Sequence, residues 1–107
     1  MDLLQSKGQR FSGSSSTITS GSVSVIEAAS SGRSHYVTDL GASSANATAQ
    51  IRIYSGSTNY WMARVGNAEA YEKVFRVPIR ITAGSAVTAE LLNGGGSAYV
   101  NLAGYTI

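Results

Sequence analysis

The sequence predicts a single all-β domain, an antiparallel β-sandwich of about eight short strands. Apolar and polar residues alternate at period two in several short runs, and clusters of Gly, Ser and Asn separate these runs. No window shows the i, i+3, i+4, i+7 apolar spacing of an amphipathic helix. A chain of 107 residues is long enough for one domain with a modest core. Two packed antiparallel sheets would bury one apolar face of each strand.

The strands are expected over 17–26, 35–40, 48–54, 59–65, 71–81, 86–92 and 98–105. Gly21 and Pro78 interrupt two of these runs, and Pro78 marks an edge, a bulge or a bend because proline lacks an N–H for the ladder. Residues 41–46 are expected to form a loop of small residues.

Period-two alternation also predicts which side chains face the core. In the second run, His35, Val37 and Asp39 should share one face, with Leu40 on the other. The other residues expected to face inward are Ala49, Ile51, Ile53, Val87, Ala89, Leu91, Ala98, Val100 and Leu102. Four apolar residues of the 71–81 run should share a face: Phe75, Val77, Ile79 and Ile81.

Residues 1–16 are expected to form an extended, flexible N-terminal arm in front of a sandwich domain spanning 17–107. The arm has no usable periodicity, and it ends in FSGSSS, a composition typical of linkers. One interpretation is a disordered tail. The other is an arm that orders on a neighbouring subunit by docking Leu3, Leu4 and Phe11.

The composition favours a protein-binding or neutral surface over a polyanion-binding one. Only 13% of residues are charged, the formal charge is +2, and six tyrosines are present. Interfaces are similarly poor in Lys, Glu and Asp and rich in Tyr. The cations are spread along the chain, so we expect no nucleic acid partner, and no apolar stretch is long enough for a membrane span.

The residues needed for catalysis or for holding a cofactor are scarce. There is no cysteine and one histidine, His35, which on a strand would lie about 13 Å from Asp39, too far for a catalytic hydrogen bond. Zinc, calcium and phosphate sites also lack their ligands or motifs. Nothing in the sequence places two of the carboxylates, Glu27, Asp39, Glu69, Glu72 and Glu90, in one cleft. We therefore expect no enzyme and no cofactor.

A carbohydrate-binding module is an open alternative, since such modules present aromatic residues on a sandwich sheet. Tyr54, Tyr60 and Trp61 cluster around one expected hairpin, and further tyrosines could add to them: Tyr71, Tyr99 and Tyr105. The competing interpretation, which we favour for Trp61, places it in the core with the tyrosines at its rim.

Three segments resemble small structural proteins of tailed bacteriophages. They are FRVPIRITAGSAVTA over 75–89, AYVNLAGY over 98–105 and AQIRIYSG over 49–56. The resemblance covers roughly residues 22–107 and points to capsid decoration (cement) or other virion accessory proteins. It implies a jelly roll, usually a homotrimer, that binds the major capsid protein or another virion protein on the outer capsid surface and stabilises the shell.

On this interpretation the protein is assembled in the host cytoplasm, in keeping with the absence of a signal-like apolar run in residues 1–7. The expected partner-binding residues divide into polar contacts and apolar anchors, with Lys7 and Tyr54 beside them. The polar contacts are Arg10, Arg52, Arg76 and Arg80, and the anchors are Leu3, Leu4 and Phe11. The alternative function is a carbohydrate- or receptor-binding module of a phage tail or surface appendage.

Overall fold

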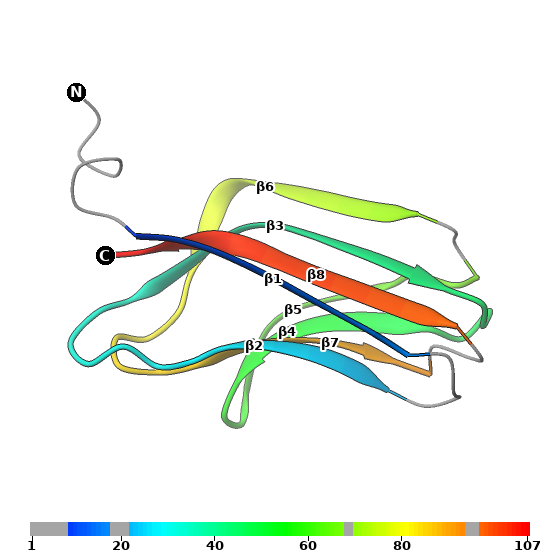
Figure 1. Cartoon of the computed structure of the whole chain (residues 1–107), viewed down its shortest axis with the longest axis horizontal. Helices are drawn as coiled ribbons and strands as arrows, with labels where there is room; N and C mark the ends of the chain where they lie inside the picture. The colour runs from blue at the N-terminus through cyan, green and yellow to red at the C-terminus, as the bar shows by residue number, and fades with distance from the viewer. Residues whose placement is uncertain (1–8, 18–21, 68–69, 94–96) are drawn as a thin grey trace.

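The computed structural model describes residues 9–17, 22–67, 70–93 and 97–107, and these residues form an all-β sandwich (Figure 1). Its eight strands are β1 Gln9–Thr17, β2 Val23–Glu27, β3 His35–Ser44, β4 Gln50–Ser55, β5 Thr58–Arg64, β6 Tyr71–Arg80, β7 Val87–Leu92 and β8 Ala98–Thr106. The sequence prediction of an antiparallel sandwich with about eight strands is confirmed.

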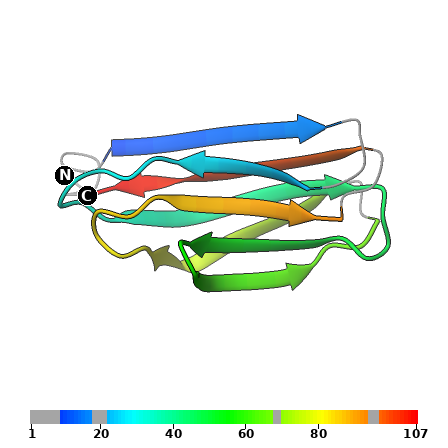
Figure 2. The ribbon, with the colours of Figure 1, turned by 90° about the horizontal axis from the view of Figure 1, so that it is seen from below.

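The strands form two four-stranded antiparallel sheets that pack face to face (Figure 2). Sheet A has the order β1-β8-β3-β6, and sheet B has the order β2-β7-β4-β5. Apart from the β4–β5 hairpin, every connection between successive strands crosses from one sheet to the other. This winding is that of a jelly roll.

The core lies between the sheets and consists of the inward residues of each strand. Ile51, Ile53, Val87, Ala89 and Leu91 of sheet B are fully buried against residues of sheet A that include Val37, Val100 and Leu102. The faces predicted for β4, β7 and β8 are therefore confirmed. At one long edge of the sandwich, the ring of Trp61 meets that of Phe75 edge to face, with the ring centroids 5.3 Å apart. Trp61 therefore packs against the core.

Strand β3 differs from the prediction in length and in phase. A register shift between Val37 and Asp39 moves the alternation by one residue, so Leu40 is buried on the same side as Val37. The expected loop over 41–46 was wrong for its first part, since β3 continues to Ser44. Gly41 and Ala42 pair with β6 on one side and with β8 on the other, so the strand continues through these small residues.

Strand β6 contains the larger irregularity. Val37 pairs with Ile79 and Asp39 with Val74, so the single residue Thr38 faces four residues of β6. This large irregularity, which we call the β6 bulge, breaks the face that Phe75, Val77, Ile79 and Ile81 were expected to share. Phe75 and Ile79 pack against the core, whereas Val77 is 78% exposed. Pro78 lies in this bulge, and β6 is an edge strand of sheet A, as proline tolerance requires.

The prediction of a flexible arm over 1–16 was wrong for residues 9–16, which belong to β1 and pair with β8 from Gln9 to Thr17. Phe11 is accordingly part of the domain itself, where it packs against the core. Alternation along β1 was hidden because its inward residues are Phe11, Gly13 and Ser15, only one of them strongly apolar. Leu3, Leu4 and Lys7 lie outside the described residues.

Candidate functional site

The outer face of sheet A turns away from the core and is not covered by any other described element. Its side chains come from all four strands. They are Arg10, Ser12, Ser14 and Ser16 of β1, Tyr99, Asn101, Ala103 and Tyr105 of β8, Tyr36, Asp39, Gly41 and Ser43 of β3, and Glu72, Val74 and Arg80 of β6. Small residues occupy much of the middle of this face, so the larger side chains around them project farther from the sheet and leave a shallow depression between them.

Three adjoining hollows lie on this face, and together we call them the trough. The first, of about 420 Å³, is lined by Ser12, Ser14, Asp39, Tyr99 and Asn101 among others. Two smaller hollows, of about 150 and 140 Å³, share Gly41, Glu72 and Asn101 with each other. Because Asn101 lines all three, the hollows adjoin one another around its side chain, on the face formed by β1, β8, β3 and β6.

The floor of the trough depends on Gly41. A Cβ at this position would lie 2.9 Å from Oδ1 of Asn101, so the asparagine side chain lies directly over the glycine. Nδ2 of Asn101 donates to the hydroxyl of Tyr99 at 3.2 Å. Since Tyr99 is only two residues away on the same strand, its ring lies along β8 beside the trough, with 39% of the residue exposed.

Two carboxylates also line the trough. Asp39 and Glu72 come from neighbouring strands and share one hollow, which sequence spacing alone did not indicate. Oδ1 of Asp39 accepts a hydrogen bond from the Thr38 hydroxyl at 2.7 Å. Glu72 is exposed, and the carboxylate oxygens of both residues can accept hydrogen bonds from a ligand.

A row of long side chains crosses sheet A at one end of the trough. The strand registers place Arg10 beside Tyr105, Tyr105 beside Tyr36, and Tyr36 beside Arg80. The two tyrosine rings stack with their centroids 5.1 Å apart and their planes at 12°. The pairing thus places two of the sequence-predicted contact residues, Arg10 and Arg80, at the two ends of one row, although they are seventy positions apart in the chain.

The outer face of sheet B carries two further sequence-predicted contact residues, Arg52 and Tyr54, and both are engaged with other side chains. Nε and Nη2 of Arg52 both donate to Oε1 of Glu90, at 2.9 and 2.7 Å, and the guanidinium carbon lies 4.3 Å from the centre of the Tyr54 ring. Exposed Ile26 and Met62 flank this group on β2 and β5. The predicted contacts therefore divide between opposite faces of the sandwich, and Arg76 stands apart from both groups on the β6 bulge.

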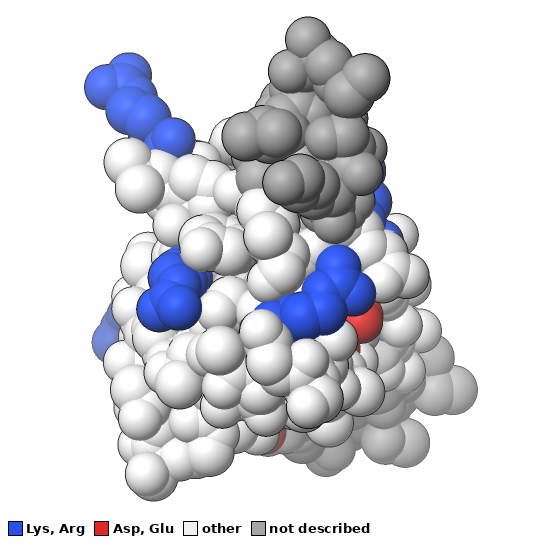
Figure 3. Space-filling model, turned by 90° about the vertical axis from the view of Figure 1, so that its left-hand side faces the viewer, with Lys and Arg blue, Asp and Glu red and all other residues white. Residues whose placement is uncertain are grey.

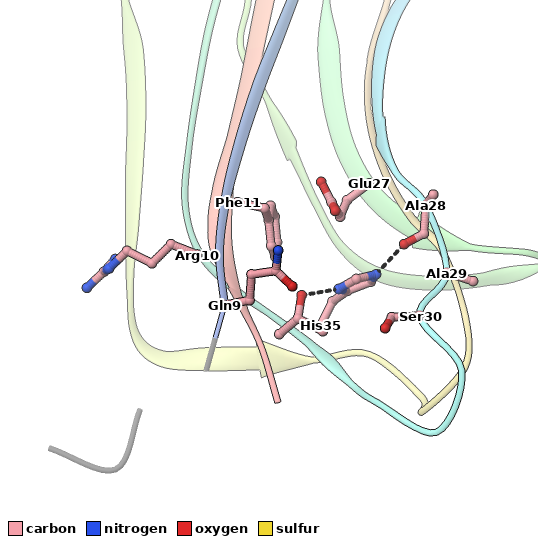
Figure 4. A pocket seen from close by; sticks show the side chains of 9 residues that line it. Gln9, Arg10, Phe11, Glu27, Ala28, Ala29, Ser30 and His35 are labelled. Carbon is pink, nitrogen blue, oxygen red and sulfur yellow. Dashed lines mark hydrogen bonds between the residues drawn. The ribbon is translucent and has the colours of Figure 1, made fainter. Parts of the chain in front are cut away.

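A separate pocket of about 240 Å³ opens at the end of the sandwich where β1 begins and β8 ends (Figure 4). His35, buried in its wall, bridges Thr106 Oγ1 at 2.7 Å and the carbonyl oxygen of Ala28 at 2.8 Å. A carbonyl can only accept, so Nε2 donates to Ala28, and in the neutral ring Nδ1 accepts from Thr106. Both ring nitrogens are engaged in holding the β2–β3 connection against β8, which is a structural role.

Within the described ranges there is no group of three or more His, Cys, Asp or Glu side chains that could hold a metal ion. The same part of the chain contains no helix that is long and apolar enough to cross a membrane.

The sequence matches no known protein-family model and shows no significant similarity to a curated protein. Among solved structures, the chain is similar to the CBM36-1 domain of a multidomain xylanase from the hindgut metagenome of Trinervitermes trinervoides. The identity is 15% and the TM-score 0.42, over 94% of this chain and 89% of that domain. This likeness concerns the β-sandwich fold alone.

Proposed function

We propose that the chain is a non-catalytic carbohydrate-binding module that holds a glycan in the trough on sheet A. The observation that carries the proposal is the lining of this trough, where Tyr99 lies beside the amide of Asn101 and the carboxylates of Asp39 and Glu72. An aromatic ring offers the C–H face of a sugar an apolar surface, and amide and carboxylate oxygens accept hydrogen bonds from its hydroxyls.

The composition of the trough favours a sugar over a protein partner. Protein-binding hot spots are built around large apolar or aromatic side chains in well-packed pockets. The floor of the trough instead consists of Ser12, Ser14 and Gly41, with Val74 as the apolar side chain at its β6 margin. An extended, open depression with many small polar groups suits a chain of hydroxylated rings.

The test is a glycan-array comparison of the wild-type chain with Tyr99→Ala and Asn101→Ala. Both variants should lose binding, whereas Tyr54→Ala, which removes a tyrosine from the opposite face, should retain it. Undiminished binding by Tyr99→Ala and Asn101→Ala would move the site away from sheet A. Release of reducing sugar from a bound glycan would contradict the non-catalytic part of the proposal.

A second candidate is a structural virion protein, such as a capsid decoration protein acting as a trimer on the outer capsid surface. It is favoured by the apolar side chains that β6 exposes: Val74 is 75% and Val77 is 78% exposed. On a chain with so few charged residues, neighbouring exposed valines are typical of a surface covered by another protein.

Light scattering behind a sizing column tests this candidate. A mass near three times 11.1 kDa that falls to 11.1 kDa in Val74→Lys would support assembly through β6. A monomer at all concentrations, with no binding to capsid shells, would remove it.

A further inference from the structure

The row across sheet A ends in two arginines, Arg10 and Arg80, that have no partner among the described residues. Arg33 donates to the Thr106 carbonyl and to Gln9, and Arg52 pairs with Glu90. Within the described residues, Arg10 and Arg80 have no such hydrogen bond, ion pair or ring contact, and both are exposed. Figure 4 shows the side chain of Arg10 extending away from the pocket that Phe11 and His35 line.

This end of the sandwich is also where positive charge gathers. Arg10 and Arg80 end the row on the two edge strands of sheet A, and Arg33 contacts Gln9 and Thr106, which pair with each other next to the Arg10–Tyr105 pair. In the view onto this end, blue side chains are prominent and little red is visible (Figure 3). A local field of one sign attracts oppositely charged ligands before they make contact.

Resting on the proposed function, we propose that the row Arg10–Tyr105–Tyr36–Arg80 selects acidic glycans, that is, glycans whose sugars carry carboxylate or sulfate groups. A guanidinium presents its donors in a planar fork that matches such an oxyanion in two parallel hydrogen bonds. The stacked tyrosines between the two arginines carry hydroxyls that can bond to the sugar ring itself.

The spacing of the arginines indicates a ligand with more than one acidic group. Arg10 and Arg80 lie on the two edge strands of sheet A, three strand intervals of about 4.8 Å apart, which separates their backbones by about 14 Å. One small anion cannot bridge this distance unless both side chains fold inward. An oligosaccharide with acidic groups on separate sugars can contact both.

The acidic residues of the trough set the direction of the ligand. Asp39 and Glu72 lie on the same face, farther along the strands from the arginine row. They repel carboxylate and sulfate groups while still accepting hydrogen bonds from neutral hydroxyls. The acidic sugars therefore lie across the strands along the row, and neutral sugars extend into the trough.

The experiment is a glycan array that carries uronic-acid, sialylated and sulfated glycans beside their neutral parents, for example oligogalacturonate beside its methyl ester. We expect the acidic members to bind at least about tenfold more tightly than their neutral partners, the effect of one charge-assisted hydrogen bond pair. Arg10→Gln and Arg80→Gln should each remove most of this preference. Arg64→Gln is the matched control, an exposed arginine on β5 of the other sheet.

The outcomes separate this inference from the function on which it rests. Equal binding of acidic and neutral partners, unaffected by Arg10→Gln and Arg80→Gln, overturns the arginine selection and leaves glycan binding in place. Binding of no glycan overturns both. An oligothymidylate of equal charge that binds as tightly as the acidic glycan also overturns the selection, since attraction would then depend on charge alone. Unchanged melting temperatures of the variants exclude a folding effect.

Discussion

The two outer faces of the sandwich hold their arginines in opposite ways. On sheet B, two N–H groups of Arg52 donate to Glu90, and its guanidinium lies over the ring of Tyr54. The Arg52 side chain is 28% exposed and the Glu90 side chain 17%. On sheet A, Arg10 and Arg80 stand at the ends of a row with their donors unengaged among the described residues. A ligand would have to break an existing pair on sheet B, whereas on sheet A it would only displace water. The partner of Arg52 therefore makes it a residue that stabilises the fold, whereas the donors of Arg10 and Arg80 are available to a ligand.

Among the substitutions that test the binding face, the largest expected effect on stability comes from Gly104, which lets β3 and β8 approach each other beneath the arginine row. A Cβ on Gly104 would collide with the carbonyl oxygen of Tyr36 and meet the ring of Phe11. We expect Gly104→Ala to lower the free energy of unfolding by about 2 kcal/mol, and the melting temperature by roughly 10 °C. Thermal and urea unfolding measure this change.

Ala103→Ser is the control for that prediction, because residue 103 points to the outer face and a hydroxyl there meets no buried neighbour. Melting of Gly104→Ala at the wild-type temperature would show that the β3–β8 pair can separate without loss, and the row of side chains above it would then not be rigidly placed.

The next effect separates ligand binding from stability on sheet A. Gly41→Val should fill the floor of the trough and displace the Asn101 side chain, which is flexible and can rotate away. Because valine has a high β-propensity and glycine weakens strands, stability should change little. Glycan affinity should fall by at least about tenfold, equivalent to roughly 1.4 kcal/mol.

Titration of the best array ligand against Gly41→Val measures this loss, and Ser24→Val, an exposed change on β2 of the opposite face, is its matched control. A wild-type affinity in Gly41→Val would exclude the trough as the binding site, whatever the array had shown.

A smaller effect tests the paired arginine directly. A double-mutant cycle with Arg52→Gln and Glu90→Gln should give a coupling energy of about 1 kcal/mol, since the pair is partly buried and shares two hydrogen bonds. Arg80→Gln, which loses no partner among the described residues, should change stability by less than about 0.5 kcal/mol. Glycan binding should show the reverse order, with a loss in Arg80→Gln and none in Arg52→Gln. Equal effects of Arg52→Gln and Arg80→Gln in both measurements would contradict the distinction between the faces.

The sequence alone predicted the strands whose alternation is regular. Ile51, Ile53, Val87, Ala89 and Leu91 all face the core as expected, because one face of each strand is consistently apolar. The prediction failed where an irregular backbone changes the phase, at the register shift beside Thr38 and along the β6 bulge. It also failed at β1, whose Gly and Ser residues pair through backbone groups that any side chain permits.

The trough could not be predicted because its members are spread from Ser12 to Asn101 and meet only through the registers of four strands. The sequence did single out Arg10 and Arg80, but it grouped them with Arg52, whose partner Glu90 lies thirty-eight positions away. The sequence-level aromatic cluster of Tyr54, Tyr60 and Trp61 does not form one exposed platform. Trp61 and Tyr60 pack against the core, and the Tyr60 hydroxyl lies 3.1 Å from that of Thr82.

The smallest expected effect concerns the β6 bulge, where alternation predicted that Val77 shares a face with Phe75, Ile79 and Ile81. Because its side chain is 78% exposed, Val77→Ser should change the free energy of unfolding by less than about 0.5 kcal/mol. Val37→Ser, the same substitution at a fully buried site on the neighbouring strand, should lose more than about 2 kcal/mol through a cavity and a buried hydroxyl. Urea unfolding at several protein concentrations is the informative measurement. A large loss of unfolding free energy in Val77→Ser that depends on protein concentration would mean that a second copy covers the bulge, which would favour the assembly candidate. A small loss at every concentration would leave β6 a solvated edge strand and sheet A the binding face.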